Sequence, residues 1–534
     1  MVQSERHGQP APDMQELPER FNFAGHLLRI NQANHARLAY IDDTRQLSYA
    51  ELDARVRAFS AGLIAYGVRP EERILLVMQD TIDMPVALLG ALYAGVVPVP
   101  VNTLLPATDY AYMLQHCAAR LAIVAAPLVP VVQEALQLTG LQTPLFVAGE
   151  VEVDTAAPGL QSFEVLIDAS AAATKPADTH ADQFAFWLYS SGSTGRPKGT
   201  VHSHANLYWT AALYGTPVLG IQRDDIVFSA AKLFFAYGLG TALTFPLTAG
   251  ATTVLMAQRP TPAAVFERLV RHQPTIFCGV PTLYVGMLAS DQLPQRAQLA
   301  LRICASAGEA LPREVGEKFK AHFGADILDG LGSTEMLHIF LSNRSGDVRY
   351  GCSGKPVPGY ALELRDERGH ATPVGEIGDL YIRGPSAALL YWTAREKSRV
   401  TFQGDWVKSG DKYVVDAAGY YTYAGRSDDM LKVSGQYVSP IEVENILMSH
   451  PSVLECAVIG HIDLEGLTRT QAYVVIRAGH GADESQANEL KAWVKGKLAP
   501  HKYPREILFV DDLPKTATGK IQRFKLRAMA SAAD

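Results

Sequence analysis

The stretch YSSGSTGRPKG, residues Tyr189 to Gly199, carries the most information about the fold of this 534-residue chain. It follows an apolar run over residues 184–188 that is typical of a buried strand, and it precedes a helical pattern over residues 204–214. Glycines permit a backbone with positive φ, and hydroxyl and lysine side chains donate hydrogen bonds. The stretch therefore predicts a loop that wraps phosphate oxygens, with a polar surface turn as the alternative.

This loop is not a Walker A motif. That motif needs Gly-x4-Gly-Lys-Ser/Thr, whereas the spacing here is Gly192-x2-Gly195-x2-Lys198. A second Gly-Lys pair ends at Lys520, but Pro514 stands where the earlier glycine would be. The sequence therefore disfavours a P-loop hydrolase or kinase.

The rest of the chain predicts an α/β fold. Apolar strand-like runs alternate with helical patterns through the first two thirds, which is typical of parallel sheet. One example is the strand-like run 73–79, which follows a helical pattern over 47–66 that opens with the capping box Ser48-Tyr-Ala-Glu51. After about residue 359, turn residues separate short alternating runs, which indicates antiparallel strands or a small barrel. A final α+β unit begins near Asp428.

Composition narrows the function classes. The chain is 48% hydrophobic with a formal net charge of −7, so it has a large core and no basic field for nucleic acid. Its five cysteines form no CxxC pair, which disfavours zinc sites and a disulfide framework. The uncharged run 84–101 has the minimum length of a membrane span, but Pro98, Pro100 and Gly95 favour a buried helix over 84–94 and a strand over 96–101. We expect a cytoplasmic protein without membrane insertion.

Six further runs complete a recognisable set. They are FFAYGLG (234–240), SAGEAL (306–311), DGLGSTE (329–335), SGD (409–411), YTYAGRSDDMLKVSGQYVSPIEVE (421–444) and PKTATGKIQR (514–523). Together with residues 189–199 they resemble the acyl-adenylate-forming superfamily of acyl-CoA synthetases, adenylation domains and luciferases, over about residues 25–530. The resemblance implies a large N-terminal domain of α/β layers with a small β-barrel-like part (1–427). It also implies a smaller, mobile α+β C-terminal domain (428–534), and ATP, Mg²⁺ and CoA as ligands.

The resemblance also implies an ATP site. Glu335 would hold Mg²⁺ and Thr334 would contact the α-phosphate, while Asp411 would accept from the ribose hydroxyls with Arg426 nearby. From the residues alone, Glu335 could instead begin a helix and Arg426 could form a structural ion pair. The segments Gly308 to Ala310 and Asp329 to Gly330 would contact adenine. The full implied set is Ser190, Ser191, Gly192, Ser193, Thr194, Gly195, Lys198, Gly308, Glu309, Ala310, Asp329, Gly330, Thr334, Asp411, Arg426 and Lys520.

Lys520 matches the family's catalytic lysine. A carboxylate that attacks a phosphate brings two anions together, and a cation between them stabilises the transition state. Asp428 matches the family's hinge, about which the small domain alternates between adenylation and thioester formation. The second pose would bring Lys432, Gly435, Gln436 and Tyr437 toward CoA. Without the resemblance, Lys520 would be a solvated lysine and Asp428 part of an exposed acidic turn.

The resemblance also places the acid pocket. The implied pocket has aromatic side chains as walls and small residues as its floor, which favours a compact flat acid. No acidic residue stands near residues 234–236 to pair with the ammonium of an amino acid. His338 could face a ring substituent or be a packed core histidine, and aliphatic packing is the alternative for the FFAYGLG run. The implied pocket consists of Phe235, Ala236, Tyr237, Gly238, Gly330, Leu331, Gly332, His338 and Ile339.

The strings FFAYGLG and LYSSGSTGRPKGTVHSHANLY (188–208) are most similar to bacterial benzoate–CoA ligases. Many coumarate- and chlorobenzoate-activating relatives have Phe-His where this chain has Phe234-Phe235. The implied reaction is benzoate, ATP and CoA giving benzoyl-CoA, AMP and pyrophosphate through benzoyl-AMP, in bacterial degradation of aromatic compounds. Open alternatives are a substituted benzoate or medium-chain acid, a carrier protein as acceptor, and a nucleotide-binding module without adenylation. A homodimer is a further open alternative.

Overall fold

The computed structural model describes residues 17–149, 160–168, 175–190, 196–427, 429–433, 436–462, 468–499, 502–515 and 521–533. The chain forms two compact units. The first runs up to Leu362 and includes Ile382–Val407, and the second takes Glu363–Tyr381 and the chain from Lys408 onward.

The first unit is built on a nine-stranded sheet with the order β16-β15-β14-β13-β12-β10-β11-β1-β2. The six strands from β14 to β1 in this order run parallel, which confirms the predicted parallel sheet. Antiparallel strands complete both edges. The strands are β1 (Leu38–Ile41), β2 (Gln46–Ser48), β10 (Ile226–Ser229), β11 (Thr252–Val254), β12 (Ile276–Gly279), β13 (Ile303–Ser306), β14 (Asp326–Gly332), β15 (Ile339–Ser342) and β16 (Lys355–Pro356).

A second sheet in this unit is entirely parallel, with the order β4-β3-β5-β6-β7. Helix α2 (Tyr49–Ala65) begins at Ser48, whose side chain and that of Glu51 form the predicted capping box. The strands are β3 (Arg73–Val77), β4 (Val97–Pro100), β5 (Leu121–Ala125), β6 (Leu145–Ala148) and β7 (Leu160–Ser162).

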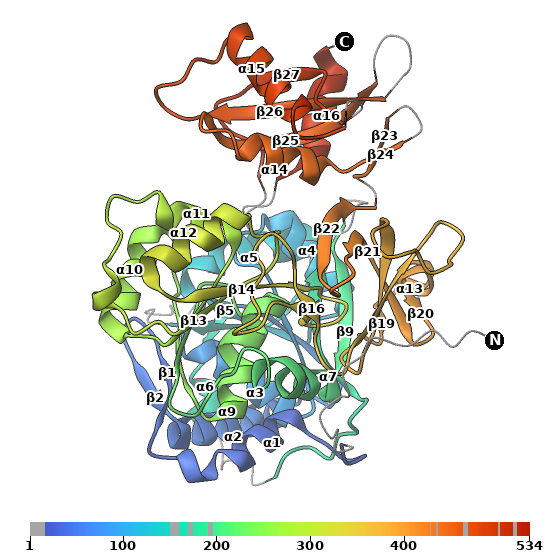
Figure 1. Cartoon of the computed structure of the whole chain (residues 1–534). Coiled ribbons are helices and arrows are strands. Elements are labelled where there is room, and N and C mark those ends of the chain that lie inside the picture. The colour runs from blue at the N-terminus through green and yellow to red at the C-terminus, as the bar shows by residue number, and fades with distance from the viewer. Residues whose placement is uncertain are drawn as a thin grey trace, which may run out of the picture. The chain divides into compact units, whose positions relative to one another are not determined.

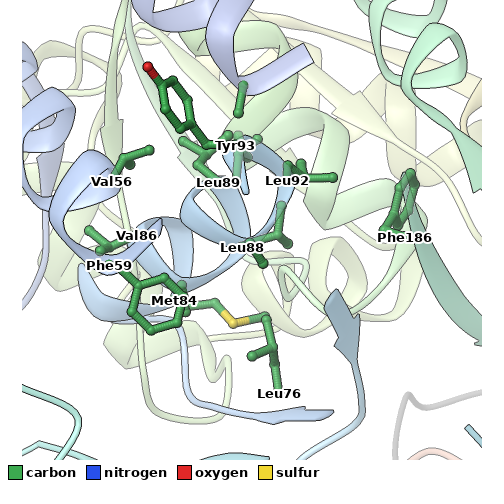
Figure 2. Close-up of a cluster of buried hydrophobic side chains, with 14 of the residues drawn as sticks. Val56, Phe59, Leu76, Met84, Val86, Leu88, Leu89, Leu92, Tyr93 and Phe186 are labelled. Carbon is green, nitrogen blue, oxygen red and sulfur yellow. The ribbon is translucent and has the colours of Figure 1, made fainter. Parts of the chain in front are cut away.

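The uncharged run 84–101 forms a core helix and a strand. Helix α3 (Asp83–Tyr93) is buried along all 11 of its residues, and β4 follows it. Figure 2 shows Leu88 and Leu92 of α3 among buried side chains from α2, β3 and β8 (Phe184–Ser190). Within the described ranges, no helix combines the length and apolar character needed to cross a bilayer. The predicted buried helix and strand are confirmed.

The stretch that follows β8 opens a hairpin. β8 pairs antiparallel with β9 (Lys198–Ser203), and β19 (Leu390–Tyr391) pairs with the other edge of β9. Helix α7 (His204–Thr210) begins where the sequence predicts, with Ser203 and Asn206 forming its cap, and continues as a π-helical turn over Ala211–Gly215. The strand β9 between loop and helix was not predicted, because its apolar positions are few.

The described part of the second unit contains strands from three sheets, together with helices (Figure 1). β22 (Tyr421–Arg426) runs antiparallel to β21 (Trp406–Val415), in a sheet that includes β17 (Ala361–Arg365) and β18 (Gly378–Arg383). A separate sheet, β25 (Val453–Ile462), β26 (Thr468–Ile476) and β27 (Glu506–Phe509), packs with α14 (Pro440–Met448), α15 (Glu484–Lys495) and α16 (Arg523–Ala533). The described chain after Asp428 thus combines helices and sheet, as predicted, and the boundary at Asp428 stays a prediction.

Candidate active site

The two flanks of the predicted phosphate loop lie opposite each other in the β8–β9 hairpin. Ser190 at the end of β8 is paired with Lys198 at the start of β9. Five residues of the prediction, Ser191 to Gly195, lie outside the described residues. The hairpin therefore holds the hydroxyl of Ser190 and the ammonium of Lys198 on the same face of the paired strands.

Glu335 meets both of these groups. It lies in a turn between β14 and β15, so the alternative that it begins a helix is wrong. Its Oε1 accepts from Ser190 Oγ at 3.4 Å and lies 3.8 Å from Lys198 Nζ. The fold thus brings Ser190 and Glu335 into contact although they are 145 positions apart in the chain.

Tyr391 completes this cluster and was not predicted from the sequence. Its hydroxyl donates to Glu335 Oε1 at 2.6 Å and accepts from Lys198 Nζ at 3.1 Å. The ammonium also lies 4.1 Å from the centroid of the tyrosine ring, a cation–π distance. Tyr391 reaches the site because β19 pairs with β9. The sequence could have indicated Tyr391 only if that strand pairing, between residues about 190 positions apart, were already known.

The charges of this cluster suit a nucleotide with its metal ion. The side chains of Lys198 and Glu335 are only 19% and 17% exposed, so their charges are weakly screened. Mg²⁺ in nucleotide sites is held by one or two carboxylates together with substrate phosphates. In the described part of the chain, no group of three or more metal-ligating side chains forms a metal site made by protein alone. Glu335 therefore fits a metal ion that arrives with phosphates.

Thr334 is held by a histidine that the sequence did not single out. His202 Nε2 lies 2.8 Å from the carbonyl oxygen of Thr334, and the ring stacks on Phe186 with centroids 5.1 Å apart. Burial lowers the pKa of His202 to about 4, against the opposing effects of its hydrogen bonds and of the Glu335 charge. A neutral imidazole at neutral pH can donate from Nε2 to this carbonyl, which fixes the turn that carries Glu335.

The segments predicted to contact adenine lie at the ends of neighbouring parallel strands. Ser306 of β13 is paired with Asp329 of β14, and Gly308 follows with a φ of +95° that favours glycine. Burial raises the pKa of Asp329 to about 8, and its carboxyl accepts from the Leu311 N–H at 3.5 Å. Near neutral pH this carboxyl is largely protonated and can donate as well as accept. Glu309, Ala310 and Gly330 lie in the same two segments.

The predicted acid pocket draws on two segments that the structure brings together. His338 Nε2 lies 3.2 Å from the Tyr237 carbonyl oxygen, and the two rings are 5.7 Å apart. A Cβ on Gly240 would come within 2.4 Å of the His338 ring, so glycine is required there. Phe235 packs against Phe234, and Ala236 and Gly238 lie in the same turn.

The second segment of this wall is the β14–β15 hairpin. Gly332 is paired with Ile339, and Leu331 precedes it. A Cβ on Gly332 would lie 2.8 Å from the His338 backbone. Burial lowers the pKa of His338 to about 3, and its Nδ1 has no hydrogen-bond partner in the described part of the chain. His338 is therefore a neutral, packed histidine beside the predicted wall.

Asp411 and Arg426 meet in the second unit. They are paired across β21 and β22, and Arg426 Nη1 lies 3.1 Å from Asp411 Oδ1. Gly410, with a φ of +77°, leaves room for the guanidinium, because a Cβ there would lie 2.9 Å from Arg426 Nη2. The structure thus contains the ion pair that the sequence left open for Arg426.

The remaining predicted residues are only partly described. Asp428, Gly435 and Lys520 lie outside the described residues. The backbones of Lys432 and Tyr437 are paired in the hairpin of β23 (Leu431–Val433) and β24 (Gln436–Val438). Their roles, and that of Gln436, stay predictions.

Comparison with known proteins identifies the family. A family model described as AMP-binding enzyme matches residues 28–392, and one described as AMP-binding enzyme C-terminal domain matches residues 442–520. This chain belongs to the AMP-binding enzyme family. The first matched region contains the whole cluster of Ser190, Lys198, Glu335 and Tyr391. The Asp411–Arg426 pair lies between the two matched regions.

Relatives within the family cover nearly the whole chain. A benzoate–CoA ligase of Thauera aromatica is 55% identical over 97% of this chain and 98% of its own length. A 4-hydroxybenzoate–CoA/benzoate–CoA ligase of Rhodopseudomonas palustris is 46% identical over 94% of this chain and 92% of its own length.

Solved structures of family members agree with the fold. A benzoate CoA ligase from Burkholderia xenovorans LB400 matches with a TM-score of 0.89 at 62% identity, covering 95% of this chain and all of that one. An anthranilate CoA ligase in complex with anthranoyl-AMP matches with a TM-score of 0.91 at 40% identity, covering 97% of this chain and 98% of that one. The predicted α/β class and the predicted superfamily are therefore confirmed.

Proposed function

We propose that this chain is an AMP-forming ligase that converts benzoate, ATP and CoA to benzoyl-CoA, AMP and pyrophosphate through benzoyl-AMP. The observation that carries the proposal is the meeting of Ser190, Lys198 and Glu335 at a phosphate loop, in the same unit as an aromatic wall. The substrate rests on that wall and on the relatives that are named benzoate–CoA ligases.

In the first half-reaction a carboxylate oxygen of benzoate attacks the α-phosphorus, and the bond to the bridging oxygen breaks as pyrophosphate leaves. Lys198 and Ser190 donate to phosphate oxygens, and Thr334 contacts the α-phosphate. Mg²⁺ held at Glu335 would neutralise phosphate charge. Lys520 supplies the cation between the two reacting anions.

In the second half-reaction the CoA sulfur attacks the carbonyl carbon of benzoyl-AMP, and AMP leaves. We place the functional boundary at Asp428, with residues 1–427 binding the acid and ATP and residues 428–534 alternating between two poses. One pose presents Lys520, and the other presents Lys432 and the segment Gly435 to Tyr437. Asp411 and Arg426 hold the ribose.

The acid wall favours an uncharged planar ring. Tyr237 supplies an aromatic face, and His338, which packs against it, is neutral because burial lowers its pKa to about 3. Gly332 and Gly238 let the backbone pack closely beside this wall, since a Cβ on either would collide with backbone atoms. These features suit benzoate better than a long or cationic acid.

The test is pyrophosphate release with ATP and Mg²⁺ across benzoate, 2-, 3- and 4-substituted benzoates, cinnamate, hexanoate and an amino acid, with and without CoA. We expect benzoate to give the fastest release and stoichiometric benzoyl-CoA. Fastest release with hexanoate or cinnamate would support the ligase reaction but refute the assignment of the acid wall. Absence of release with every acid would refute the ligase itself.

The two-pose scheme has its own test. Lys520→Ala should abolish benzoyl-AMP formation yet retain much of the conversion of supplied benzoyl-AMP and CoA to benzoyl-CoA. The two rates are measured separately by pyrophosphate release and by thioester absorbance. Equal loss of both half-reactions would contradict domain alternation.

A further inference from the structure

Lys232 lies immediately before the predicted acid wall, and its ammonium points back to the sheet rather than to the site. Its Nζ donates to three consecutive carbonyl oxygens that follow β11. These belong to Met256, to Gln258 at 2.8 Å and to Ala257 at 3.4 Å. Burial lowers the pKa of Lys232, while the charge of Asp80 opposes this shift.

This arrangement uses the full donor capacity of the ammonium. A lysine ammonium has three N–H donors, and here each faces one of the three carbonyls. Lys232 is thus engaged with protein backbone and is not the group that would pair with the carboxylate of a bound acid. Its role is therefore structural and depends on the backbone segments that its hydrogen bonds connect.

Asp80 holds the next residue. The backbone N–H of Leu233 lies 3.2 and 3.3 Å from the two oxygens of Asp80, which is only 2% exposed. Burial raises the pKa of Asp80 to about 6, with Lys232 and this hydrogen bond opposing the rise. A buried carboxylate and a half-buried ammonium thus anchor two consecutive residues, Lys232 and Leu233.

The anchored backbone of Lys232 contacts the turn that carries the predicted acid wall. The Phe235 N–H donates to the Lys232 carbonyl at 3.0 Å. A Cβ on Gly238 would lie 2.0 Å from that same carbonyl oxygen, so the turn closes directly on Lys232. Any displacement of Lys232 must therefore move the residues between them, including Ala236 and Tyr237.

We infer that Lys232 and Asp80 are positioning residues that set the geometry of the aryl-acid wall and so determine affinity for the acid. The inference rests on the proposed function of that wall. A displacement of about 1 Å at a substrate-positioning element can change turnover by roughly 100-fold. The effect should fall on the acid and leave the nucleotide unaffected, because Ser190, Lys198 and Glu335 lie on other elements.

The test compares Lys232→Met with Lys320→Met, which removes an exposed lysine paired with Asp326. Pyrophosphate release is measured at varied benzoate and at varied ATP, together with the thermal midpoint. For Lys232→Met we expect KM for benzoate to rise roughly 10- to 100-fold and KM for ATP to stay within about twofold. The Lys320→Met control should match the wild type in both.

Two Asp80 variants test the second anchor separately, including the case that Lys232→Met does not fold. Asp80→Asn keeps an acceptor for Leu233 and should leave KM for benzoate within about threefold, whereas Asp80→Ala should raise it about tenfold or more. Unchanged KM for benzoate in folded Lys232→Met or Asp80→Ala protein overturns the inference, as does an equal rise for ATP. If the wild type activates no acid, the proposed function fails instead.

Discussion

Tyr391→Phe tests the cluster that joins the phosphate loop to Glu335. The wild-type hydroxyl donates to Glu335 Oε1 at 2.6 Å and accepts from Lys198 Nζ at 3.1 Å, while the two charged atoms stay 3.8 Å apart. Without the hydroxyl, the ammonium and carboxylate can close into a direct ion pair. Triphosphate binding would then have to break that pair before Lys198 could donate to phosphate and Glu335 could meet a metal ion.

The size of the effect follows from the bond that is lost. A hydrogen bond to a charged group contributes about 1.5–3 kcal/mol, and each 1.4 kcal/mol corresponds to about tenfold in affinity. The cluster is mostly shielded from water, with Lys198 and Glu335 side chains 19% and 17% exposed, so little of this is screened. We expect KM for ATP to rise roughly 10- to 150-fold, while the ring keeps its cation–π contact with Lys198.

The assay is pyrophosphate release at saturating benzoate with ATP varied. Tyr49→Phe is the matched control, because it removes a buried hydroxyl that donates to the Ala251 carbonyl at 2.7 Å. Its KM for ATP should be that of the wild type. A KM for ATP within twofold of wild type in Tyr391→Phe, with an unchanged thermal midpoint, would refute the reasoning.

One further outcome follows from the proposed acid wall and two follow from burial. Ala236→Phe should abolish benzoate-dependent pyrophosphate release but retain ATP binding by calorimetry, and unchanged turnover would remove Ala236 from the wall. Leu88→Ala, at a side chain without exposed surface, should lower the free energy of unfolding by about 2–5 kcal/mol in urea, with a smaller loss contradicting a tightly packed α3. Burial lowers the pKa of His204 to about 3, so only the unfolded chain binds this proton as the pH falls below about 6.5. His204 should therefore contribute about 1.4 kcal/mol per pH unit to the loss of stability between about pH 6 and pH 5. The slope should be less steep by about this amount in His204→Gln, and equal slopes would contradict it.

Local patterning was sufficient to predict much of the fold. The capping pair Ser48 and Glu51 gives the start of α2, and Gly95 separates a core helix from a strand that contains Pro98 and Pro100. Strand β9 escaped prediction, because the run 198–203 has the polar and small residues of a loop and becomes a strand only by pairing with β8 and β19. Pairing partners distant in sequence leave no local periodicity.

The same distinction separates the predicted from the unpredicted parts of the site. Lys198 and Glu335 stand in dense runs of glycine, serine and threonine, whose composition indicates phosphate chemistry before any contact is known. Tyr391, His202 and Lys232 have no such setting, since each acts by holding another residue in place across a long sequence separation. A tyrosine beside Trp392, or a lysine before an apolar run, is as typical of a packed core as of a site.

A physical reason underlies this division. Several of the groups proposed to touch phosphate come as donors on one short loop, where together they can replace part of the hydration of an anion. Groups that orient those donors need only one hydrogen bond each, such as His202 to the Thr334 carbonyl or Tyr391 to Glu335, and any element of the sheet can supply it. Variants of the orienting residues should therefore change KM for one substrate at a time, whereas variants of Lys198 or Glu335 should reduce adenylation with every acid.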